Sequence, residues 1–207
     1  MEKKKKGMLL FFNLIALFLF IWIANNVNKQ GPILFDTWII EVVEIFRSHS
    51  MTTFMEWITA FGGKKILSFV LIIGAFFLLF KYRSYVAAFC FVILVPLSSY
   101  FNRLLKGVFV RERPEINPHV DALGYSFPSG HSTSAMATYG FLIFILYNTS
   151  WNFKRVMIFF LALLIFLIGI SRIYVHAHYP TDVVAGFSFG FICLSTMIWI
   201  YQKLMKQ

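Results

Sequence analysis

Charged residues are scarce in this chain. Asp, Glu, Lys and Arg make up 14% of its 207 residues, whereas 59% are hydrophobic and 19% are aromatic. A water-soluble domain of this length would need a larger polar shell to cover so much apolar surface, so this composition excludes an ordinary soluble globular protein. Apolar runs of about 17–25 residues recur, the length needed to cross a bilayer core as a helix. The sequence therefore predicts an all-α, polytopic membrane protein with one domain over residues 1–207.

Cysteines and clustered carboxylates, which often bind metals, are also scarce. The two cysteines, Cys90 and Cys193, both fall inside predicted membrane spans. There we expect them to pack as small apolar residues rather than to form a disulfide or a metal site. No group of carboxylates suggests a divalent cation. We therefore predict neither a metal nor a cofactor.

Acidic residues are outnumbered by basic ones, 9 to 19, and the formal net charge is +10. The sequence lacks a soluble module of interleaved basic and aromatic residues that would bind nucleic acid. The basic residues flank the apolar runs instead, which makes the lipid bilayer the expected partner. Nothing in the sequence predicts an oligomeric state.

The first apolar run lacks the cleavage site of a signal peptide. It follows Lys3 to Lys6, extends over residues 8–27 and ends in Ala24-Asn25-Asn26. A cleaved signal peptide has a shorter apolar core and small residues at its cleavage site. We expect this run to be an uncleaved first membrane span.

Six spans are predicted in all, over residues 8–27, 64–80, 84–106, 131–147, 154–171 and 181–201. An even number of spans places both termini on one side of the membrane. Ten basic residues lie on that side and nine on the other, where most belong to polar strings or lie beside acids. The positive-inside rule therefore favours cytoplasmic termini in a multi-pass protein of the cell membrane.

The segment between the first two spans has a different pattern. Over residues 35–61, Thr37, Glu41, Glu44 and Ser48 recur at helical spacing among apolar residues. This pattern is typical of an amphipathic helix that lies in the membrane interface, here the outer one. Such a helix would serve either as a packing element or as a gate for lipids, and the sequence leaves both open.

Three short polar strings interrupt the apolar sequence. They are Lys106 to Arg113-Pro114, then Pro128-Ser129-Gly130-His131, and finally Ser171-Arg172 through to His178 and Asp182. Each string lies where a predicted span begins or ends. Residues 107–127 contain prolines and several charges, so they must form a loop outside the bilayer core. In the six-span topology, all three strings reach the outer face of the membrane.

These strings contain the groups that bind a phosphate. The helices that start near His131 and Thr181 present free N–H groups and the positive end of a helix dipole. Lys106, Arg113 and Arg172 supply full positive charges, and arginine binds phosphate oxygens in a bidentate fashion. Ser129 and Gly130 would complete the phosphate site, because glycine lets main-chain N–H groups approach the oxygens closely.

Two histidines supply the chemistry. His178 precedes Asp182 by four residues, so the carboxylate can hold one ring nitrogen and leave the other free to attack phosphorus. His131 begins the neighbouring helix and is the candidate general acid, which later activates water as a base. The predicted catalytic residues are thus His178, His131 and Asp182.

In sequence order, the three strings match the signature motifs of the type-2 phosphatidic acid phosphatase superfamily, which the chain resembles over most of its length. The matching motifs are Lys106-x6-Arg113-Pro114, Pro128-Ser129-Gly130-His131 and Ser171-Arg172-x5-His178-x3-Asp182. One such motif alone would be weak, whereas three with the expected spacing are specific. One departure is His176, where many relatives have glycine or another small residue.

The resemblance implies a phosphohistidine at His178, a leaving-group acid at His131, metal independence and an outward-facing site. The expected enzyme hydrolyses lipid phosphomonoesters or pyrophosphates at the outer leaflet. Phosphatidylglycerophosphate and undecaprenyl diphosphate are the leading substrates, with phosphatidic acid behind them. A vanadate-type haloperoxidase would share the anion site, although such relatives are larger and soluble. A non-catalytic lipid-phosphate binding or transport protein would have no reason to place His178 against Asp182.

Five further positions, two of which form one pattern, have two readings. Arg111 contacts the phosphate indirectly or belongs to the loop, and Arg103 contacts lipid headgroups or packs at the interface. His176 tunes the nucleophile or only shapes its loop. Gly186 and Gly190 form a G-x-x-x-G pattern in the last span, which favours close packing inside the bundle over a dimer interface.

Overall fold

The computed structural model describes residues 2–27, 31–114 and 124–205, with the main chain alone for residues 2–6, and this part of the chain is all-helical. The elements are α1 (Glu2–Asn26), α2 (Leu34–Ile45), α3 (His49–Ala60), α4 (Lys64–Phe80), α5 (Tyr85–Phe109), α6 (Gly130–Tyr147), α7 (Lys154–Tyr174) and α8 (Pro180–Leu204). Part of the predicted loop 107–127, including Glu115, Pro118, His119 and Asp121, lies outside the described residues.

Each of the six predicted spans corresponds to one helix, α1 and α4 to α8, and most boundaries agree within a few residues. Local sequence explains several of these boundaries. Ser84 caps α5 by accepting a hydrogen bond from the Ala87 N–H at 3.3 Å, and Pro180 occupies the first turn of α8, where its missing N–H costs nothing. Four helices extend beyond the predicted spans by three residues or more, since α1 begins at Glu2, α5 continues to Phe109, α7 to Tyr174 and α8 to Leu204.

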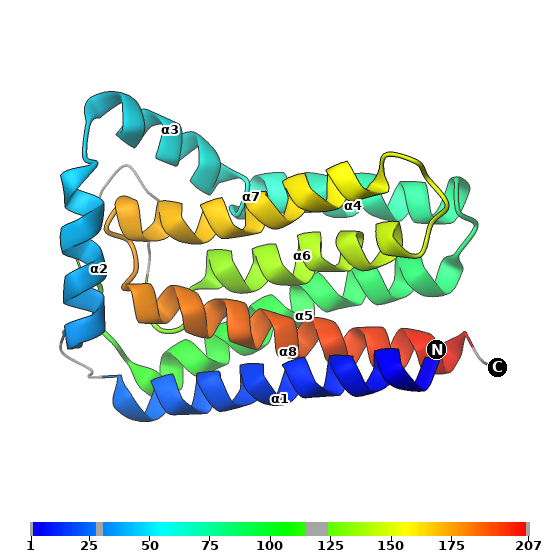
Figure 1. Cartoon of the computed structure of the whole chain (residues 1–207), viewed down its shortest axis with the longest axis horizontal. Helices are drawn as coiled ribbons and strands as arrows, with labels where there is room; N and C mark the ends of the chain where they lie inside the picture. The colour runs from blue at the N-terminus through cyan, green and yellow to red at the C-terminus, as the bar shows by residue number, and fades with distance from the viewer. Residues whose placement is uncertain (1, 28–30, 115–123, 206–207) are drawn as a thin grey trace.

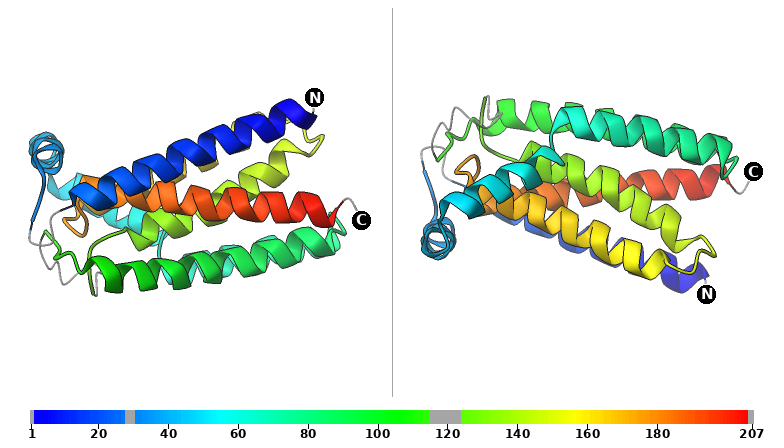
Figure 2. Two further views of the ribbon diagram at one scale, coloured as in Figure 1. Left: turned by 90° about the horizontal axis from the view of Figure 1, so that it is seen from below. Right: turned by 90° about the horizontal axis from the view of Figure 1, so that it is seen from above.

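The expectation of a single amphipathic helix over residues 35–61 is wrong, because the structure divides this segment into α2 and α3. α2 ends at Ile45, and Ser48, which is extended and accepts a hydrogen bond from the Met51 N–H at 3.2 Å, caps α3. The two helices diverge at this point. Figures 1 and 2 show α2 lying across one end of the bundle, while α3 runs back toward α4.

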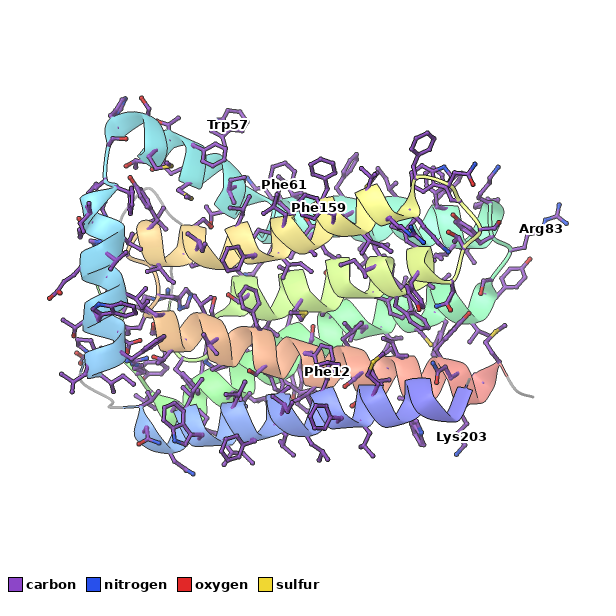
Figure 3. All side chains as sticks on the ribbon, viewed as in Figure 1. Phe12, Trp57, Phe61, Arg83, Phe159 and Lys203 are labelled. Carbon is purple, nitrogen blue, oxygen red and sulfur yellow. The ribbon has the colours of Figure 1, made fainter. Side chains whose placement is uncertain are left out.

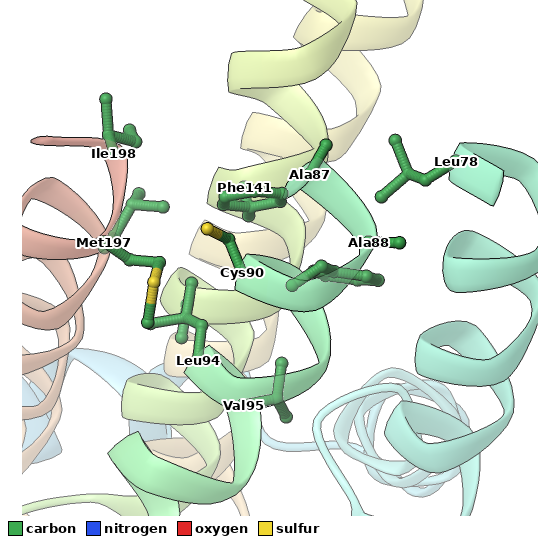
Figure 4. Packing of buried hydrophobic residues seen from close by; sticks show 12 residues of the cluster. Leu78, Ala87, Ala88, Cys90, Leu94, Val95, Phe141, Met197 and Ile198 are labelled. Carbon is green, nitrogen blue, oxygen red and sulfur yellow. The ribbon is translucent and has the colours of Figure 1, made fainter. Parts of the chain in front are cut away.

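The remaining helices form a bundle with α6 in a central position. α6 contacts α4, α5, α7 and α8, and α1 packs on the outer side of α8. One core cluster lies between α5, α6 and α8, where Cys90, Leu94, Phe141 and Met197 pack together. Both cysteines are free, as predicted, and Cys90 is fully buried in this cluster (Figure 4).

The glycine pattern on α8 packs inside the bundle, as predicted. A Cβ atom on Gly186 would lie 2.6 Å from the Ser129 carbonyl oxygen, and one on Gly190 would lie 2.6 Å from that of Thr133. Both carbonyls lie at the start of α6. The glycines therefore let the main chains of α6 and α8 approach closely at the end of the bundle where the polar strings lie.

The protein is a multi-pass membrane protein, and four of its described helices are long and apolar enough to cross a bilayer. These are α1 over Gly7–Asn26, α5, α7 and α8. A fifth candidate is the pair α3 and α4, bent by 45°, if it is counted as one broken span. Large apolar side chains such as Phe12 and Phe159 project outward from the bundle, as lipid-facing residues do (Figure 3).

Candidate active site

The three polar strings meet at one end of the bundle, as the predicted alternation of spans requires. α5 and α7 end there, α6 and α8 begin there, and α2 lies across this end (Figure 1). Both chain termini lie at the opposite end. The candidate site is therefore built from helix ends and from the segments that connect them.

The predicted cations Lys106 and Arg113 are held by main-chain carbonyl groups. Lys106 Nζ donates to the Ser126 carbonyl at 3.0 Å and also to that of Tyr125. Arg113 donates through Nε to the Gly124 carbonyl at 2.7 Å and through Nη1 to the Ala177 carbonyl at 2.6 Å. These bonds bring the ends of the first string next to the second and third.

The third predicted cation, Arg172, is buried in the last turn of α7. Its Nη1 donates to the Thr59 hydroxyl of α3 at 2.8 Å. Its main-chain carbonyl accepts hydrogen bonds from the N–H groups of Ala177 and His178 at 3.1 Å. Arg172 thus shapes the loop that carries His178 and joins it to α3.

His178 is buried, with 2% of its surface exposed. Arg113 Nη1 lies 3.3 Å from its Nε2. A guanidinium group can only donate, so Nε2 carries a lone pair and Nδ1 carries the proton. Burial lowers the pKa of His178 well below its ordinary value, and the charges of Lys106, Arg113 and Arg172 lower it further. The imidazole is therefore neutral, with an unprotonated Nε2 facing the cations.

The other side of His178 faces a serine and a carboxylate. Nδ1 lies 3.3 Å from the Ser126 hydroxyl oxygen and 3.5 Å from Asp182 Oδ2. Ser126 in turn donates a short hydrogen bond to Asp182 Oδ2. Because 3.5 Å is beyond the usual hydrogen-bond range, the Ser126 hydroxyl is the group that connects the imidazole to the carboxylate.

Asp182 is fully buried and has several donors. Its Oδ2 accepts from the Tyr179 N–H at 2.9 Å, which closes the first turn of α8, as well as from Ser126. Its Oδ1 accepts from Arg111 Nη1 at 2.6 Å. The carboxylate is thus fixed in position from both sides.

Ser129 and Gly130 form the start of α6. The Ser129 N–H donates to the Asp182 carbonyl at 2.9 Å, and its hydroxyl accepts from Ser132 Oγ at 3.0 Å and from the Ser132 N–H at 3.4 Å. Ser129 therefore acts as the cap of α6 and ties it to α8. Gly130 is the first helical residue, so the N–H groups of the first turn are oriented toward this end of the bundle.

His131 lies beside the turn between α3 and α4. A Cβ atom on Gly62 would lie 3.0 Å from His131 Cδ2, and one on Gly63 would lie 3.8 Å from His131 Nε2. His131 is the second residue of α6 and directly follows Ser129 and Gly130. The structure thus brings all eight predicted site residues to one end of the bundle.

Sequence reasoning missed several residues of this site. They are Ser126, Asp36, Thr59 and the pair Gly62-Gly63. No local signal separates Arg111 from Arg113, because residues two apart in an extended segment are expected on the same side. Arg113 approaches His178, and Arg111 approaches Asp182 instead of the phosphate-binding side.

His176 has a positive φ of 54° and lies two residues before His178. Its Nε2 lies 2.6 Å from Glu44 Oε1 and 2.6 Å from Arg47 Nη2. These contacts favour the loop-shaping role for His176. Within residues 2–27, 31–114 and 124–205, no three His, Cys, Asp or Glu side chains are grouped so that they could hold a metal ion.

Comparison with known proteins places this geometry in a family. Residues 84–206 match the model of the family described as the PAP2 superfamily. The chain is 30% identical over 197 residues to phosphatidylglycerophosphatase B from Bacillus subtilis, and the match covers 93% of this chain and 96% of that protein. It is also 34% identical over 119 residues to a lipid A 1-phosphatase from Rhizobium etli, which covers 53% of this chain and 47% of the relative.

Solved structures have the same fold. The chain superposes on the transmembrane PAP2-type phosphatidylglycerolphosphate phosphatase from Bacillus subtilis with a TM-score of 0.81 at 24% identity, over 93% of this chain and 96% of the other. The LpxE structure from Aquifex aeolicus gives a TM-score of 0.66 at 24% identity, over 81% and 96% of the two chains.

Proposed function

This chain belongs to the PAP2 superfamily and is a membrane lipid phosphatase, and we propose that it transfers the lipid phosphate to His178 before releasing it to water. The observation that carries this proposal is the arrangement of groups around the His178 ring. Arg113 faces Nε2, while Ser126 and Asp182 face Nδ1. This arrangement leaves a lone pair on Nε2, among cations that would hold the phosphate.

In the first step, Nε2 of His178 attacks phosphorus while the bond from phosphorus to the lipid oxygen breaks. The imidazole gains positive charge, which the Asp182 carboxylate stabilises through Ser126. Lys106, Arg113 and Arg172, with the N–H groups of Gly130 and its neighbours, hold the non-bridging oxygens, where a loose transition state carries its negative charge. One P–N bond forms as one P–O bond breaks, and the lipid oxygen leaves with a proton from His131.

His131 transfers the protons of both steps. It donates a proton to the departing lipid oxygen and becomes neutral. A water molecule then enters, His131 takes a proton from it, and the resulting hydroxide attacks phosphorus as the P–N bond breaks. Inorganic phosphate leaves, and both imidazoles return to their starting states. The first turn of α6 would position His131 for this role, with Gly62 and Gly63 packed against its ring.

The substrate is a lipid with an accessible terminal phosphate. The relative that matches nearly the whole chain is a phosphatidylglycerophosphatase, which supports phosphatidylglycerophosphate as the first candidate. A dolichyldiphosphatase from Saccharomyces cerevisiae is 32% identical over 114 residues, about half of each chain, which supports a polyprenyl diphosphate such as undecaprenyl diphosphate as the second. Phosphatidic acid ranks behind them.

We further propose that six helices cross the cell membrane, namely α1 and α4 to α8. α6 is not among the apolar candidates, since its first half carries Ser, Thr and His residues of the site, and α4, with 17 residues, is short for a span. In this arrangement α2 lies in the outer interface, the termini are cytoplasmic and the site opens to the outer leaflet.

The test is phosphate release from detergent-solubilised lipids by the purified protein. We expect turnover in the presence of EDTA and none measurable for His178→Ala, with His49→Ala, at an exposed histidine in the first turn of α3, as the histidine control. Wild-type release by His178→Ala would overturn the nucleophile, and loss of activity in EDTA would overturn the metal-free mechanism. Side-by-side assays on the three lipids would rank the substrates, and the absence of any phosphate release with lipid binding intact would favour a binding or transport role.

A further inference from the structure

Asp36 is a fully buried carboxylate on α2, the helix that lies across the end of the bundle. Its Oδ1 accepts from the Thr181 N–H at 2.8 Å and from the Thr181 hydroxyl at 2.8 Å. Asp36 therefore occupies the N-terminal end of α8, where a negative charge is favoured by free N–H groups and the helix dipole. This contact joins two segments that are 145 positions apart in the sequence.

Arg111 lies between Asp36 and the carboxylate of the site. Its Nη2 donates to Asp36 Oδ2 at 2.7 Å, and its Nη1 donates to Asp182 Oδ1 at 2.6 Å. All three side chains are fully buried. The guanidinium group also lies over the Tyr179 ring, 4.1 Å from its centroid, which restricts its plane. One cation thus bridges two carboxylates in a fixed geometry.

This bridge determines which oxygen of Asp182 is available to His178. Arg111 occupies Oδ1, so Oδ2 is left for Ser126, the Tyr179 N–H and the Nδ1 side of His178. If Asp36 were lost, Arg111 would have Asp182 as its one remaining carboxylate partner in this bridge. The Gly31 carbonyl would still accept from Nη2 at 3.0 Å, but the charged partner that fixes the guanidinium group from α2 would be gone, so the group could shift and rotate Asp182 with it.

A second contact joins α2 to the same loop. Arg47, just beyond the end of α2, donates to the Tyr174 carbonyl at 2.9 Å, and Glu44 contacts His176. Both contacts are partly exposed, so they contribute less than the buried bridge. α2 therefore holds the segment that carries His178 at its beginning and at its end.

We propose that Asp36 and Arg111 are positioning residues for the catalytic carboxylate, so that α2 sets the orientation of Asp182 and, through it, of His178. This inference rests on the proposed role of His178 as nucleophile. Neither residue touches the phosphate in this arrangement. Their loss should therefore slow the chemical step without weakening the binding of phosphate by Lys106, Arg113 and Arg172.

The experiment compares Asp36→Asn, Asp182→Asn and the double variant, with Glu41→Gln as the control. Glu41 is an exposed carboxylate on the same helix, so it tests the effect of removing a charge from α2 alone. A misplacement of about 1 Å in a catalytic group costs about 100-fold in rate, so we expect Asp36→Asn to lower kcat by about 10- to 100-fold. KM and the inhibition constant of inorganic phosphate should change little, and Glu41→Gln should behave as the wild type.

The double variant gives the sharper result. If Asp36 acts through Asp182, the double variant should be no slower than Asp182→Asn alone, because the group being positioned is already impaired. Rate losses that multiply in the double variant would overturn the proposal, as would an unchanged kcat in Asp36→Asn. If His178→Ala is inactive while Asp36→Asn is unaffected, this inference fails and the proposed nucleophile stands.

Arg111→Lys is a second variant in case Asp36→Asn does not fold. Lysine keeps the charge between the two carboxylates but lacks the planar fork that bonds both of them at once. We expect a lower kcat, an unchanged inhibition constant for inorganic phosphate and a cooperative thermal unfolding transition. A wild-type kcat would overturn the proposal, and so would a weakened phosphate inhibition with kcat unchanged.

Discussion

The connection between His178 and Asp182 depends on one hydroxyl group. Ser126 is fully buried and lies between the two side chains, 3.3 Å from Nδ1 and in a short hydrogen bond to Oδ2. Ser126→Ala removes this bridge and leaves the 3.5 Å separation of His178 and Asp182 without a connecting group. The Tyr179 N–H and Arg111 still hold the carboxylate, so we expect the protein to fold.

The expected loss of kcat follows from the positive charge on His178 that this bridge stabilises. A hydrogen bond to a charged group contributes about 1.5–3 kcal/mol, and each 1.36 kcal/mol of barrier corresponds to about tenfold in rate. If the bridge acts mainly when His178 becomes positively charged, Ser126→Ala should lower kcat by about 10- to 100-fold. KM should change little, because Lys106 and Arg113 hold the same carbonyl groups as before.

The assay is steady-state phosphate release with Ser98→Ala as the matched control. Ser98 is also a fully buried serine, but its hydroxyl donates to the Val95 carbonyl of its own helix. Ser98→Ala should therefore retain wild-type kcat. A wild-type kcat in Ser126→Ala, or a loss seen in KM alone, would refute the bridging role.

Three further predictions concern pH, packing and metal. The pKa of His178 lies well below its unfolded value of about 6.5, so ionisation of this group should leave kcat/KM unaffected down to that pH. Protein stability should fall as the pH drops below about 6.5, because protonation of His178 favours the unfolded chain. A His178-dependent loss of kcat/KM above pH 7 would contradict this. Gly186→Ala would place a Cβ atom 2.6 Å from the Ser129 carbonyl, so overpacking should cost about 1–3 kcal/mol of stability. Gly107→Ala, within α5 and with nothing within 4 Å, should not lower the thermal unfolding midpoint and should raise it slightly, because alanine favours a helix more than glycine does. Dialysis against EDTA should leave turnover intact, and restoration of lost turnover by one added divalent cation would contradict the metal-free mechanism.

The helices could be predicted from the sequence because their signals are local. The predicted range 64–80 matches α4 at both ends, and the starts of α6 and α7 agree within one residue. The close packing of Gly186 and Gly190 was also predictable, since small residues spaced by four share one face of a helix. The three polar strings had fixed positions relative to the helix ends, so their convergence followed from alternation alone.

The supporting contacts could not be predicted in this way. Asp36 meets Arg111 over 75 positions of sequence, and Arg172 meets Thr59 over 113. Neither pair has a spacing that a local pattern would reveal, because each depends on how α2 and α3 fold back over the bundle. The break at Ser48 was missed for a related reason, since the apolar and polar positions on both sides of it follow the same helical period.

The most direct test of the account is to identify the phosphorylated residue. The purified protein would be mixed with a radiolabelled lipid phosphate, quenched in alkali, which preserves phosphorus–nitrogen bonds, and digested for mass spectrometry. The account predicts an acid-labile phosphate on the peptide that contains His178, and no such label in His178→Ala. A phosphorylated serine or carboxylate, or full turnover with no label at any time after mixing, would contradict it.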